Sequence, residues 1–407
     1  MVRFVHTADL HLDRPFRGLK DLNARVKSTV LDASFATYER IIDLTIEQHA
    51  DAFLVAGDAY DGDDRSLRAQ LAFVEGLERL DSAGIHSFIC HGQHDRLDEW
   101  TARLRFPKRA HRFGPGIEVV PLDTDHQVEV IGISQPHSMS IPNLAREFEE
   151  ARNSAFSIGL LAADVTGEIQ ALNDSSLTYW ALGSIHRHAA YRDQRPAIAY
   201  PGSPQGHHPE ETGPRGAYVV DIDRRGRITR QFHHLDTIRW IEIQVNLTGI
   251  PTQPELFETV ERRIERQIAD ADNRAIIYRL IFEGHGPLAG TLADTDTIAD
   301  IVARLNDDYG DREVFAWCHH ASYSPGTALD ADDKPQTGDV IGALLRLSDE
   351  FRNDGERLRQ LEAELAPLLE DPRFLPYRDE AGLSDRDMVE IINEAEARLL
   401  AELGSTE

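Results

Sequence analysis

The chain has 407 residues, of which 41% are hydrophobic, so it is long enough for two domains with buried cores. No run of about 18 apolar residues occurs and the N-terminus passes directly into a strand-like segment, so we expect a cytoplasmic protein without a membrane span or signal peptide. The net charge of -27 argues against a nucleic-acid binder, although it does not exclude a local groove in which a divalent metal or a basic stripe holds phosphate.

The first half of the chain alternates short apolar runs with helical patterns, which is typical of an α/β domain. We expect strands at 2–7, 52–56 and 85–90, and helices at 29–50 and 66–83. From about residue 116 the apolar runs shorten and crowd together. They predict strands at 117–121, 127–134, 157–161, 179–182, 197–200, 217–222 and 228–234, with a long loop region at 134–154. Many strands with few helices indicate a second sheet that closes the domain as a sandwich.

The last part of the chain has a different pattern. Strand-like runs at 240–247, 275–282 and 314–320 alternate with helical patterns at 254–271 and 295–308, which predicts a small α+β domain. Segment 324–338 has the composition of a linker, and amphipathic helices follow it. The expected organisation is therefore a first domain at 1–238, a second at 239–323, a linker at 324–338 and a helical tail at 339–407. The apolar stripes of the tail either pack on the second domain or dock a partner's helices.

The two cysteines, Cys90 and Cys318, are far apart in the sequence. Each closes an apolar strand-like run. This setting is typical of buried reduced thiols, and it does not favour a disulfide or a metal pair.

Four short polar strings each follow a predicted strand, where an α/β sheet presents its ligand-binding loops. They are Asp9-Leu10-His11, Gly57-Asp58-Ala59-Tyr60-Asp61, Gly92-Gln93-His94-Asp95 and Gly183-Ser184-Ile185-His186. An Asp and a His two residues apart at a strand end project the same way, so both can reach one cation. Taken singly, such a string is more often a turn or a helix cap than a metal site. Their order and their strand-end context indicate a metal centre.

In this order the four strings resemble the signature of the calcineurin-like metallophosphoesterases. Two further strings, Thr7-Ala8-Asp9-Leu10-His11-Leu12-Asp13 and Tyr200-Pro201-Gly202-Ser203-Pro204-Gln205-Gly206, are similar to the SbcD and YhaO branch of DNA repair exonucleases. The resemblance covers Asp9 to about Gly206, and beyond it only the layout agrees. It implies a four-layer α/β/β/α metallophosphoesterase sandwich, with the small α+β domain and the helical tail appended, that binds two manganese-class ions.

The resemblance also implies the ligands of each ion. The first ion would be bound by four residues that are all present: Asp9, His11, Asp58 and His186. The second ion would share Asp58 and take an Asn and two His, but these three positions hold Gln93, Ser184 and Ala162. Because all three departures affect the same ion, we expect one tightly bound ion, which is Mn²⁺ or another divalent metal such as Mg²⁺, Fe²⁺ or Zn²⁺. Gln93 could still offer a carbonyl oxygen, and Asp164 or His91 are alternative substitutes.

The resemblance assigns His94 as the proton donor to the leaving group, a role suited to a histidine. Asp61 and Asp95 lie near it in the sequence and are expected to orient it. One divalent ion can lower the pKa of its water from ~15.7 toward ~7, so the first step of phosphodiester hydrolysis remains available. Two ions would in addition clamp the attacking and leaving oxygens, which requires the second site.

Two basic clusters are candidates for phosphate contact. The cluster at 103–112 includes Arg105 and Arg109 and contains no acid, but it is equally typical of a solvated surface loop. The other cluster contains Arg187, His188 and Arg192 and follows the last metal motif directly. Its position makes it the stronger candidate for substrate binding.

Three functions remain open from the sequence. The leading hypothesis is a metal-dependent DNA phosphodiesterase, an exonuclease or endonuclease subunit of a DNA repair complex. By the resemblance its partners are DNA and an SbcC-like coiled-coil ATPase that binds the C-terminal helices, with a homodimer left open and no membrane partner. A second hypothesis is a catalytically impaired pseudo-nuclease that acts as a scaffold for DNA ends or the ATPase. A third is a mononuclear phosphoesterase for small substrates.

Overall fold

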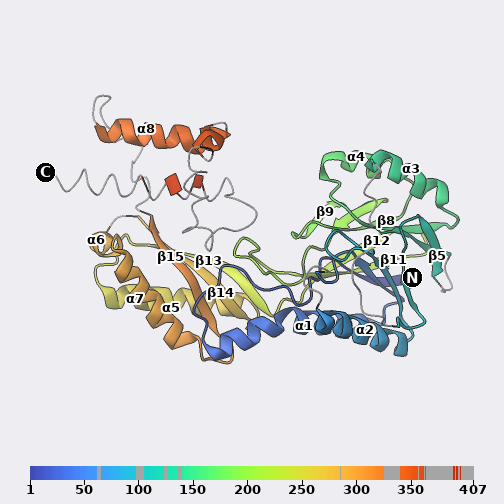
Figure 1. Ribbon diagram of the computed structural model, residues 1–407, viewed down its shortest axis with the longest axis horizontal. Helices are drawn as coiled ribbons and strands as arrows, with labels where there is room; N and C mark the ends of the chain where they lie inside the picture. The colour runs from blue at the N-terminus through green and yellow to red at the C-terminus, as the bar shows by residue number, and fades with distance from the viewer. Residues whose placement is uncertain are drawn as a thin grey trace. The chain divides into compact units, whose positions relative to one another are not determined.

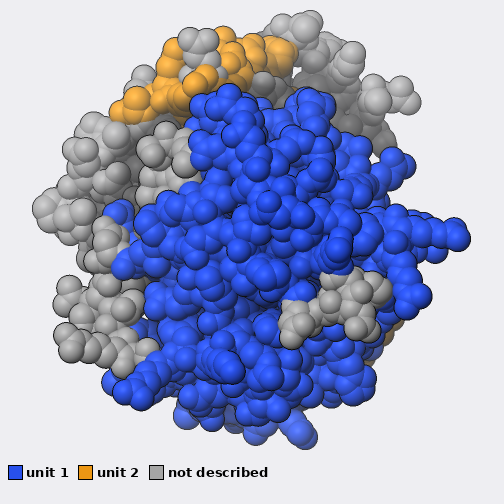
Figure 2. All heavy atoms as spheres, turned by 90° about the vertical axis from the view of Figure 1, so that its right-hand side faces the viewer, with its two compact units in different colours: residues 1–242, 263–279, 302–320 blue, residues 243–262, 280–301, 321–407 orange. Residues whose placement is uncertain are grey.

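The computed structural model describes residues 1–61, 66–97, 105–122, 127–134, 140–284, 286–324 and 340–355, and a few positions beyond them. It divides into two compact units (Figure 2). Unit 1 comprises residues 1–242, 263–279 and 302–320, and unit 2 comprises residues 243–262, 280–301 and 321–407. Within the described residues, no helix is both long and apolar enough to cross a membrane.

The first sheet of unit 1 has the strand order β12-β11-β1-β2-β3-β4. Figure 1 labels its strands β11 and β12. Its strands are β1 (Val2–Thr7), β2 (Ala52–Ala56), β3 (His86–Cys90), β4 (Ala110–Arg112), β11 (Gly216–Ile222) and β12 (Ile228–His234). Strands β1 to β4 run parallel, while β11 pairs antiparallel with both β1 and β12. The carboxyl ends of β1, β2 and β3 therefore meet at one edge of the sheet, where the first three polar strings begin.

Two helices cover the outer face of this sheet. Helix α1 (Ala24–Glu47) begins after Asn23, whose side chain accepts a hydrogen bond from the Val26 N–H at 2.8 Å. Helix α2 (Leu67–Ser82) has Ser66 in the same capping role. Their buried faces pack on the sheet in one apolar core, which includes Val5, Ile41, Phe53, Phe73 and Leu77. The spacing of the helical residues in this core is that of an amphipathic helix.

The second sheet has the order β5-β6-β7-β8-β10-β9. Its strands are β5 (Glu118–Leu122), β6 (Val128–Ile133), β7 (Phe156–Ala162), β8 (Tyr179–Gly183), β9 (Ala189–Arg192) and β10 (Ala197–Tyr200). Helices α3 (Ile141–Ala151) and α4 (Ile169–Asn173) cover its outer face through a core that includes Phe148, Leu172 and Trp180. Helix α3 precedes β7, and the 3-10 turn Thr166–Glu168 lies between β7 and α4. The inner faces of the two sheets share one further core, which contains Phe4, Leu54, Phe88, Val130, Ile158 and Tyr179. The predicted α/β/β/α sandwich is therefore confirmed.

The remaining elements form a three-stranded sheet with helices. Its order is β13-β14-β15, with β13 (Ile238–Asn246), β14 (Ala275–Glu283) and β15 (Ala316–Ser324). The helices are α5 (Gln253–Asp270), α6 (Ala289–Leu292), α7 (Thr295–Tyr309) and α8 (Val340–Asn353). The strands and the two long helices predicted here are confirmed. Cys90 and Cys318 are both buried, as predicted, and form no disulfide with each other.

The loop predicted at 134–154 is wrong, because most of it is helix α3. Pro142 lies in the first turn, where its missing N–H costs no helical hydrogen bond. Leu144, Ala145 and Phe148 form the buried face. Of the predicted linker and tail, residues 325–339 and most positions after 361 lie outside the described residues.

Candidate metal centre

The polar strings lie in loops at the carboxyl ends of neighbouring strands. The loop after β1 is held against the loop after β2, because the Asp9 N–H donates to the Gly57 carbonyl oxygen at 3.1 Å and the His11 N–H donates to the Asp58 carbonyl oxygen at 3.0 Å. Asp9, His11 and Asp58 have φ values of 49°, 43° and 50°. Left-handed backbone is uncommon for residues other than glycine and is concentrated at functional sites.

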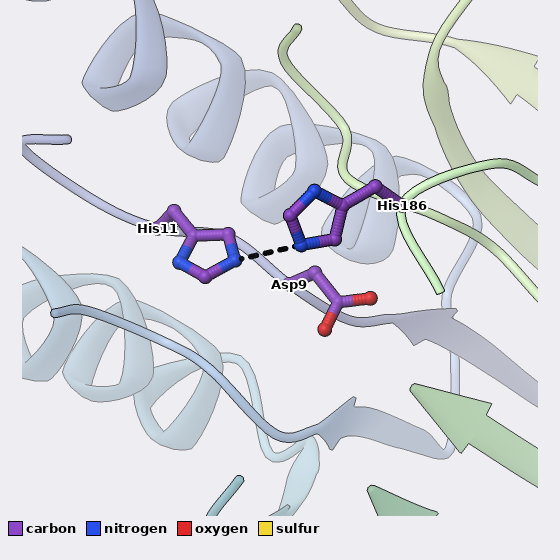
Figure 3. Close-up of side chains that lie close together, drawn as sticks. All are labelled: Asp9, His11 and His186. Carbon is purple, nitrogen blue, oxygen red and sulfur yellow. Dashed lines mark hydrogen bonds between the residues drawn. The ribbon is translucent and has the colours of Figure 1, made fainter. Parts of the chain in front are cut away.

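Three of the four predicted ligands of the first ion converge. Asp9, His11 and His186 each offer one ligand atom, and these atoms lie within 4.8 Å of one another (Figure 3). Asp58 is not part of this group. It lies beside it, since its Oδ1 accepts a hydrogen bond from the His94 N–H at 2.9 Å and its charge raises the pKa of Asp9.

Each imidazole of the group is held by a carboxylate. His11 Nδ1 lies 2.7 Å from Asp61 Oδ1, and His186 Nδ1 lies 2.8 Å from Glu211 Oε1. Carboxylate partners favour the tautomer with the proton on Nδ1, which turns the other ring nitrogen into the ligand atom. The two Nε2 atoms accordingly face each other at 3.2 Å. Two nitrogen lone pairs at this distance require a proton or a cation between them.

The charges of the group also fit a cation. Burial, together with the charge of Asp58, raises the pKa of Asp9 to about 7. Burial and the charge of Asp95 raise the pKa of Asp58. Burial alone would lower the pKa of His186, but its hydrogen bond to Glu211 and the charge of Asp9 raise it. A divalent ion would neutralise the buried carboxylates and replace the proton between the rings, and two imidazoles with carboxylates suit Mn²⁺, Fe²⁺ or Zn²⁺.

Among the described residues, the group that could hold a metal includes none of the three positions that depart from the expected pattern. Gln93 is exposed. Ser184 contributes its backbone N–H, which donates to the two Asp9 carboxylate oxygens at 2.9 and 3.1 Å. Ala162 packs against Gly57, where a Cβ on the glycine would lie 2.4 Å from that of Ala162.

The two alternative substitutes have other partners. His91 Nδ1 lies 2.8 Å from the Asp95 carbonyl oxygen, and its Nε2 accepts a hydrogen bond from Arg112 Nε at 3.1 Å. Asp164 accepts hydrogen bonds from the backbone and hydroxyl of Thr166. These contacts give His91 and Asp164 structural roles.

His94 lies at the exposed side of the group, with its ring centroid 5.2 Å from that of His11. Within the described residues, the hydrogen bonds of the two carboxylates expected to orient it go to other groups. Asp61 bonds to His11, and buried Asp95 accepts hydrogen bonds from the N–H groups of Asp58, Ala59 and Gly92. Asp61 thus orients His11, while Asp95 ties the loops after β2 and β3 together.

The predicted substrate contacts differ in their surroundings. Arg187 and His188 are exposed beside His186, and the His188 ring stacks on Phe232 at a centroid distance of 4.3 Å. Arg192 donates to the carbonyl oxygens of Asn173 and Arg195, which gives it a structural role at the end of β9.

In the other basic cluster, Arg109 forms an ion pair with Asp81 at 3.2 Å. Arg105 is exposed, and residues 103 and 104 lie outside the described ranges. Of the residues predicted to contact substrate, Arg187 and His188 are therefore the ones next to the metal-ligand group.

Sequence reasoning missed Glu211 and Arg215. Glu211 is the acceptor for His186, and its ion-pair partners hold its pKa well below the usual range although burial acts in the opposite direction. Buried Arg215 donates to the carbonyl oxygens of His186 at 2.6 Å and Glu211 at 2.8 Å. The only sequence signal was the position of Glu211 at the end of a polar string that continues from Gly206.

Comparisons with known proteins place the chain among metallophosphoesterases. The family model described as calcineurin-like phosphoesterase matches residues 2–163, and the model of the middle domain of metallophosphoesterase YhaO matches residues 240–320. An uncharacterized metallophosphoesterase YhaO of Bacillus subtilis is 30% identical over 331 residues, which cover 77% of this chain and 79% of the relative.

Two more distant relatives are DNA double-strand break repair proteins Mre11. That of Aeropyrum pernix is 29% identical over 227 residues, covering 50% of this chain and 53% of the relative. That of Sulfurisphaera tokodaii is 25% identical over 309 residues, covering 69% and 73%. With the matched family model, the YhaO relative and the strand-end ligand group, the chain belongs to the calcineurin-like metallophosphoesterases, on their YhaO branch.

Proposed function

We propose that the protein is a metal-dependent phosphodiesterase that hydrolyses DNA. The observation that carries the proposal is the pair of Nε2 atoms of His11 and His186, which face each other at 3.2 Å beside the buried carboxylate of Asp9. DNA is the proposed substrate because the Mre11 relatives are named as DNA double-strand break repair proteins.

The residues of the site take distinct roles in this proposal. Asp9, His11 and His186 would hold one divalent ion, with Asp58 as the adjacent fourth ligand. When bound, the ion supplies Lewis-acid polarisation of a phosphoryl oxygen and activation of water. His94 donates a proton to the leaving oxygen, and its backbone contact with Asp58 fixes its distance from the ligand group. Arg187 and His188 contact flanking phosphates.

The proposed stoichiometry is one tightly bound ion per chain. It is supported by Gln93, Ser184 and Ala162, which present no imidazole or carboxylate at the family's second position. The same observation favours a second candidate function, a scaffold that binds DNA without cleaving it. A phosphoryl transfer site with one ion has no second ion to stabilise the negative charge on the leaving oxygen. Turnover therefore depends more strongly on proton donation by His94.

The proposed partner of the C-terminal region is an SbcC-like coiled-coil ATPase. Leu358, Met388 and Ile392 pack into one small core, whereas Leu347 and Ile391 remain exposed. Exposed apolar residues on amphipathic helices are suited to docking another helix. This partnership rests on the family resemblance, and co-purification of the ATPase with the wild-type chain but not with Leu347→Asp would support it.

The decisive experiment is Mn²⁺-dependent degradation of linear plasmid DNA by the purified chain. We expect His186→Ala to lose both Mn²⁺ binding and cleavage. We expect His94→Ala to keep Mn²⁺ binding and to lose about 10² to 10⁴ in rate, as for removal of a general acid. His86→Ala is the matched control, because His86 begins β3 at the opposite end of the strand from the site and should behave as wild type.

The outcomes separate the three functions. Cleavage of equal rate in the wild type and His186→Ala would contradict the metal-dependent mechanism. One bound Mn²⁺ per chain with DNA binding and no cleavage would show the scaffold. Hydrolysis of bis(p-nitrophenyl) phosphate with no action on DNA would show the small-substrate phosphoesterase.

A further inference from the structure

We propose that Glu211 is a positioning residue that holds the His186 ring as a metal ligand, an inference that rests on the proposed metal site. Glu211 Oε1 lies 2.8 Å from His186 Nδ1. Its other oxygen, Oε2, accepts a hydrogen bond from the His207 backbone N–H at 2.6 Å. Both carboxylate oxygens are thus engaged, so the side chain has one orientation, and this orientation directs His186 Nε2 toward His11.

The backbone around Glu211 is fixed by Arg215. The Arg215 side chain donates from Nε to the Glu211 carbonyl oxygen at 2.8 Å and from Nη1 to the His186 carbonyl oxygen at 2.6 Å. One buried guanidinium therefore sets the distance between the loop that carries His186 and the segment that carries Glu211. His207 anchors this segment further, because its Nε2 lies 2.8 Å from the Ser34 hydroxyl oxygen on α1.

His186 depends on such a partner more than His11 does. The His11 side chain is 0% exposed, so packing alone restricts its ring, whereas the His186 side chain is 32% exposed. A partly exposed imidazole without a partner for Nδ1 can rotate and exchange tautomers. We therefore expect loss of Glu211 to weaken metal binding more than loss of Asp61, the corresponding carboxylate at His11.

Only a carboxylate meets the two demands at this position. Glutamine has one acceptor oxygen and an NH₂ group, so it can accept from His186 Nδ1–H or from the His207 N–H but not from both. When the amide oxygen accepts from one of these two donors, the NH₂ group faces the other donor, and two donors cannot form a hydrogen bond with each other. Glu211→Gln keeps the size of the side chain and should still position the His186 ring poorly for metal binding.

The test measures Mn²⁺ affinity of the full chain from the electron paramagnetic resonance signal of free Mn²⁺. We expect Glu211→Ala to weaken binding by about 10- to 100-fold, as for removal of a residue that orients a ligand. The Mn²⁺ affinity of Glu211→Gln should lie between those of Glu211→Ala and the wild type. Asp61→Asn should lose less Mn²⁺ affinity than Glu211→Gln. Glu210→Gln is the control, because its exposed carboxylate lies 3.8 Å from His208 and should not affect Mn²⁺.

A second measurement separates positioning from a structural role. In the Zn²⁺-saturated wild type, nitrogen-15 NMR of labelled histidines should show a slowly exchanging Nδ1–H that is absent in His186→Ala. This signal should be lost in Glu211→Ala even when Zn²⁺ is saturating, while circular dichroism shows the same melting as in Glu210→Gln.

The two proposals fail in different ways. Wild-type Mn²⁺ affinity in both Glu211→Gln and Glu211→Ala, with cleavage intact, would overturn the role of Glu211 and leave the proposed function standing. A wild-type chain that binds no Mn²⁺ would overturn the proposed function itself. If Glu211→Ala does not fold, the Mn²⁺ affinity of Glu211→Gln decides.

Discussion

His11 Nε2 and His186 Nε2 lie 3.2 Å apart although the residues are separated by 175 positions in the chain. His11 follows a strand of the first sheet and His186 follows a strand of the second. Each ring gives its Nδ1 to a carboxylate, so the facing nitrogens are the atoms that remain for a ligand.

Metal binding should raise the thermal stability of the folded chain. A ligand that binds only the folded state stabilises it by about 2.7 kcal/mol at 100 times its dissociation constant. We expect a higher melting temperature in the presence of Mn²⁺ for the wild type and for the His86→Ala control. Differential scanning calorimetry checks this, and an equal rise in His11→Ala would show that Mn²⁺ acts elsewhere.

Mn²⁺ affinity should fall as the pH falls below about 7. The pKa of Asp9 is raised to about 7 by burial and by the charge of Asp58, so below that pH the carboxyl is protonated and must lose its proton before it binds a cation. The raised pKa of His186 acts in the same direction. One displaced proton corresponds to a tenfold loss in affinity per pH unit. Titrations with Mn²⁺ at pH 6, 7 and 8 measure this, and equal affinities would contradict it.

Acid should destabilise the fold through His6. This buried histidine lies 3.1 Å from the Tyr179 hydroxyl oxygen, and burial, together with the charge of Arg230, lowers its pKa to about 3. Since the folded pKa lies below the unfolded value, its contribution is complete above about pH 6.5 and is lost as the pH falls toward 3.

The neutral variant His6→Asn removes this proton uptake. Between pH 6 and pH 4 the wild type should lose about 1.4 kcal/mol more per pH unit in its free energy of unfolding than His6→Asn. Urea unfolding at each pH gives both values. Parallel pH dependence of the two proteins would show that His6 does not titrate on unfolding.

Gly202 should be needed for the loop that carries His186. Its φ is 73°, and a Cβ there would lie 2.6 Å from the His186 carbonyl oxygen and 2.7 Å from the His188 nitrogen. Gly84 has a similar φ of 81° with nothing within 4 Å, so Gly84→Ala carries the backbone strain alone, about 1–2 kcal/mol.

Gly202→Ala should therefore lose more free energy of unfolding than Gly84→Ala, and it should also weaken Mn²⁺ binding by moving His186. Gly84→Ala should keep wild-type Mn²⁺ affinity. Equal destabilisation of the two variants with unchanged Mn²⁺ affinity would contradict the role of this glycine.

Strands were predictable both where the sequence is continuously apolar, as in β2, and where apolar and polar residues alternate, as in β12. Strands β1, β2, β10 and β12 begin and end at the predicted residues. Helix α3 was missed because its buried face consists of only Leu144, Ala145 and Phe148, and because Pro142 suggests a loop when its position in the first turn is not considered.

The candidate site was predictable only in its local part. Asp9 and His11 are two residues apart just after a strand, and this spacing predicted that both reach one cation. In the structure both have left-handed backbone, so the turn after β1, and not strand geometry, brings them together. The partners of the rings do not follow from spacing. Asp61 was assigned to His94 but bonds to His11, and Glu211 reaches His186 across 25 residues, because both contacts depend on ring orientations that tertiary packing sets.

The origin of the two facing histidines has a consequence for assembly of the fold. Neither sheet carries both rings, so the binding site comes into being only when the two sheets dock. An ion bound there would cross-link the loops of the two sheets at their carboxyl-terminal edge. Removing it with a chelator should make these loops more mobile first, while the apolar core between the sheets stays packed.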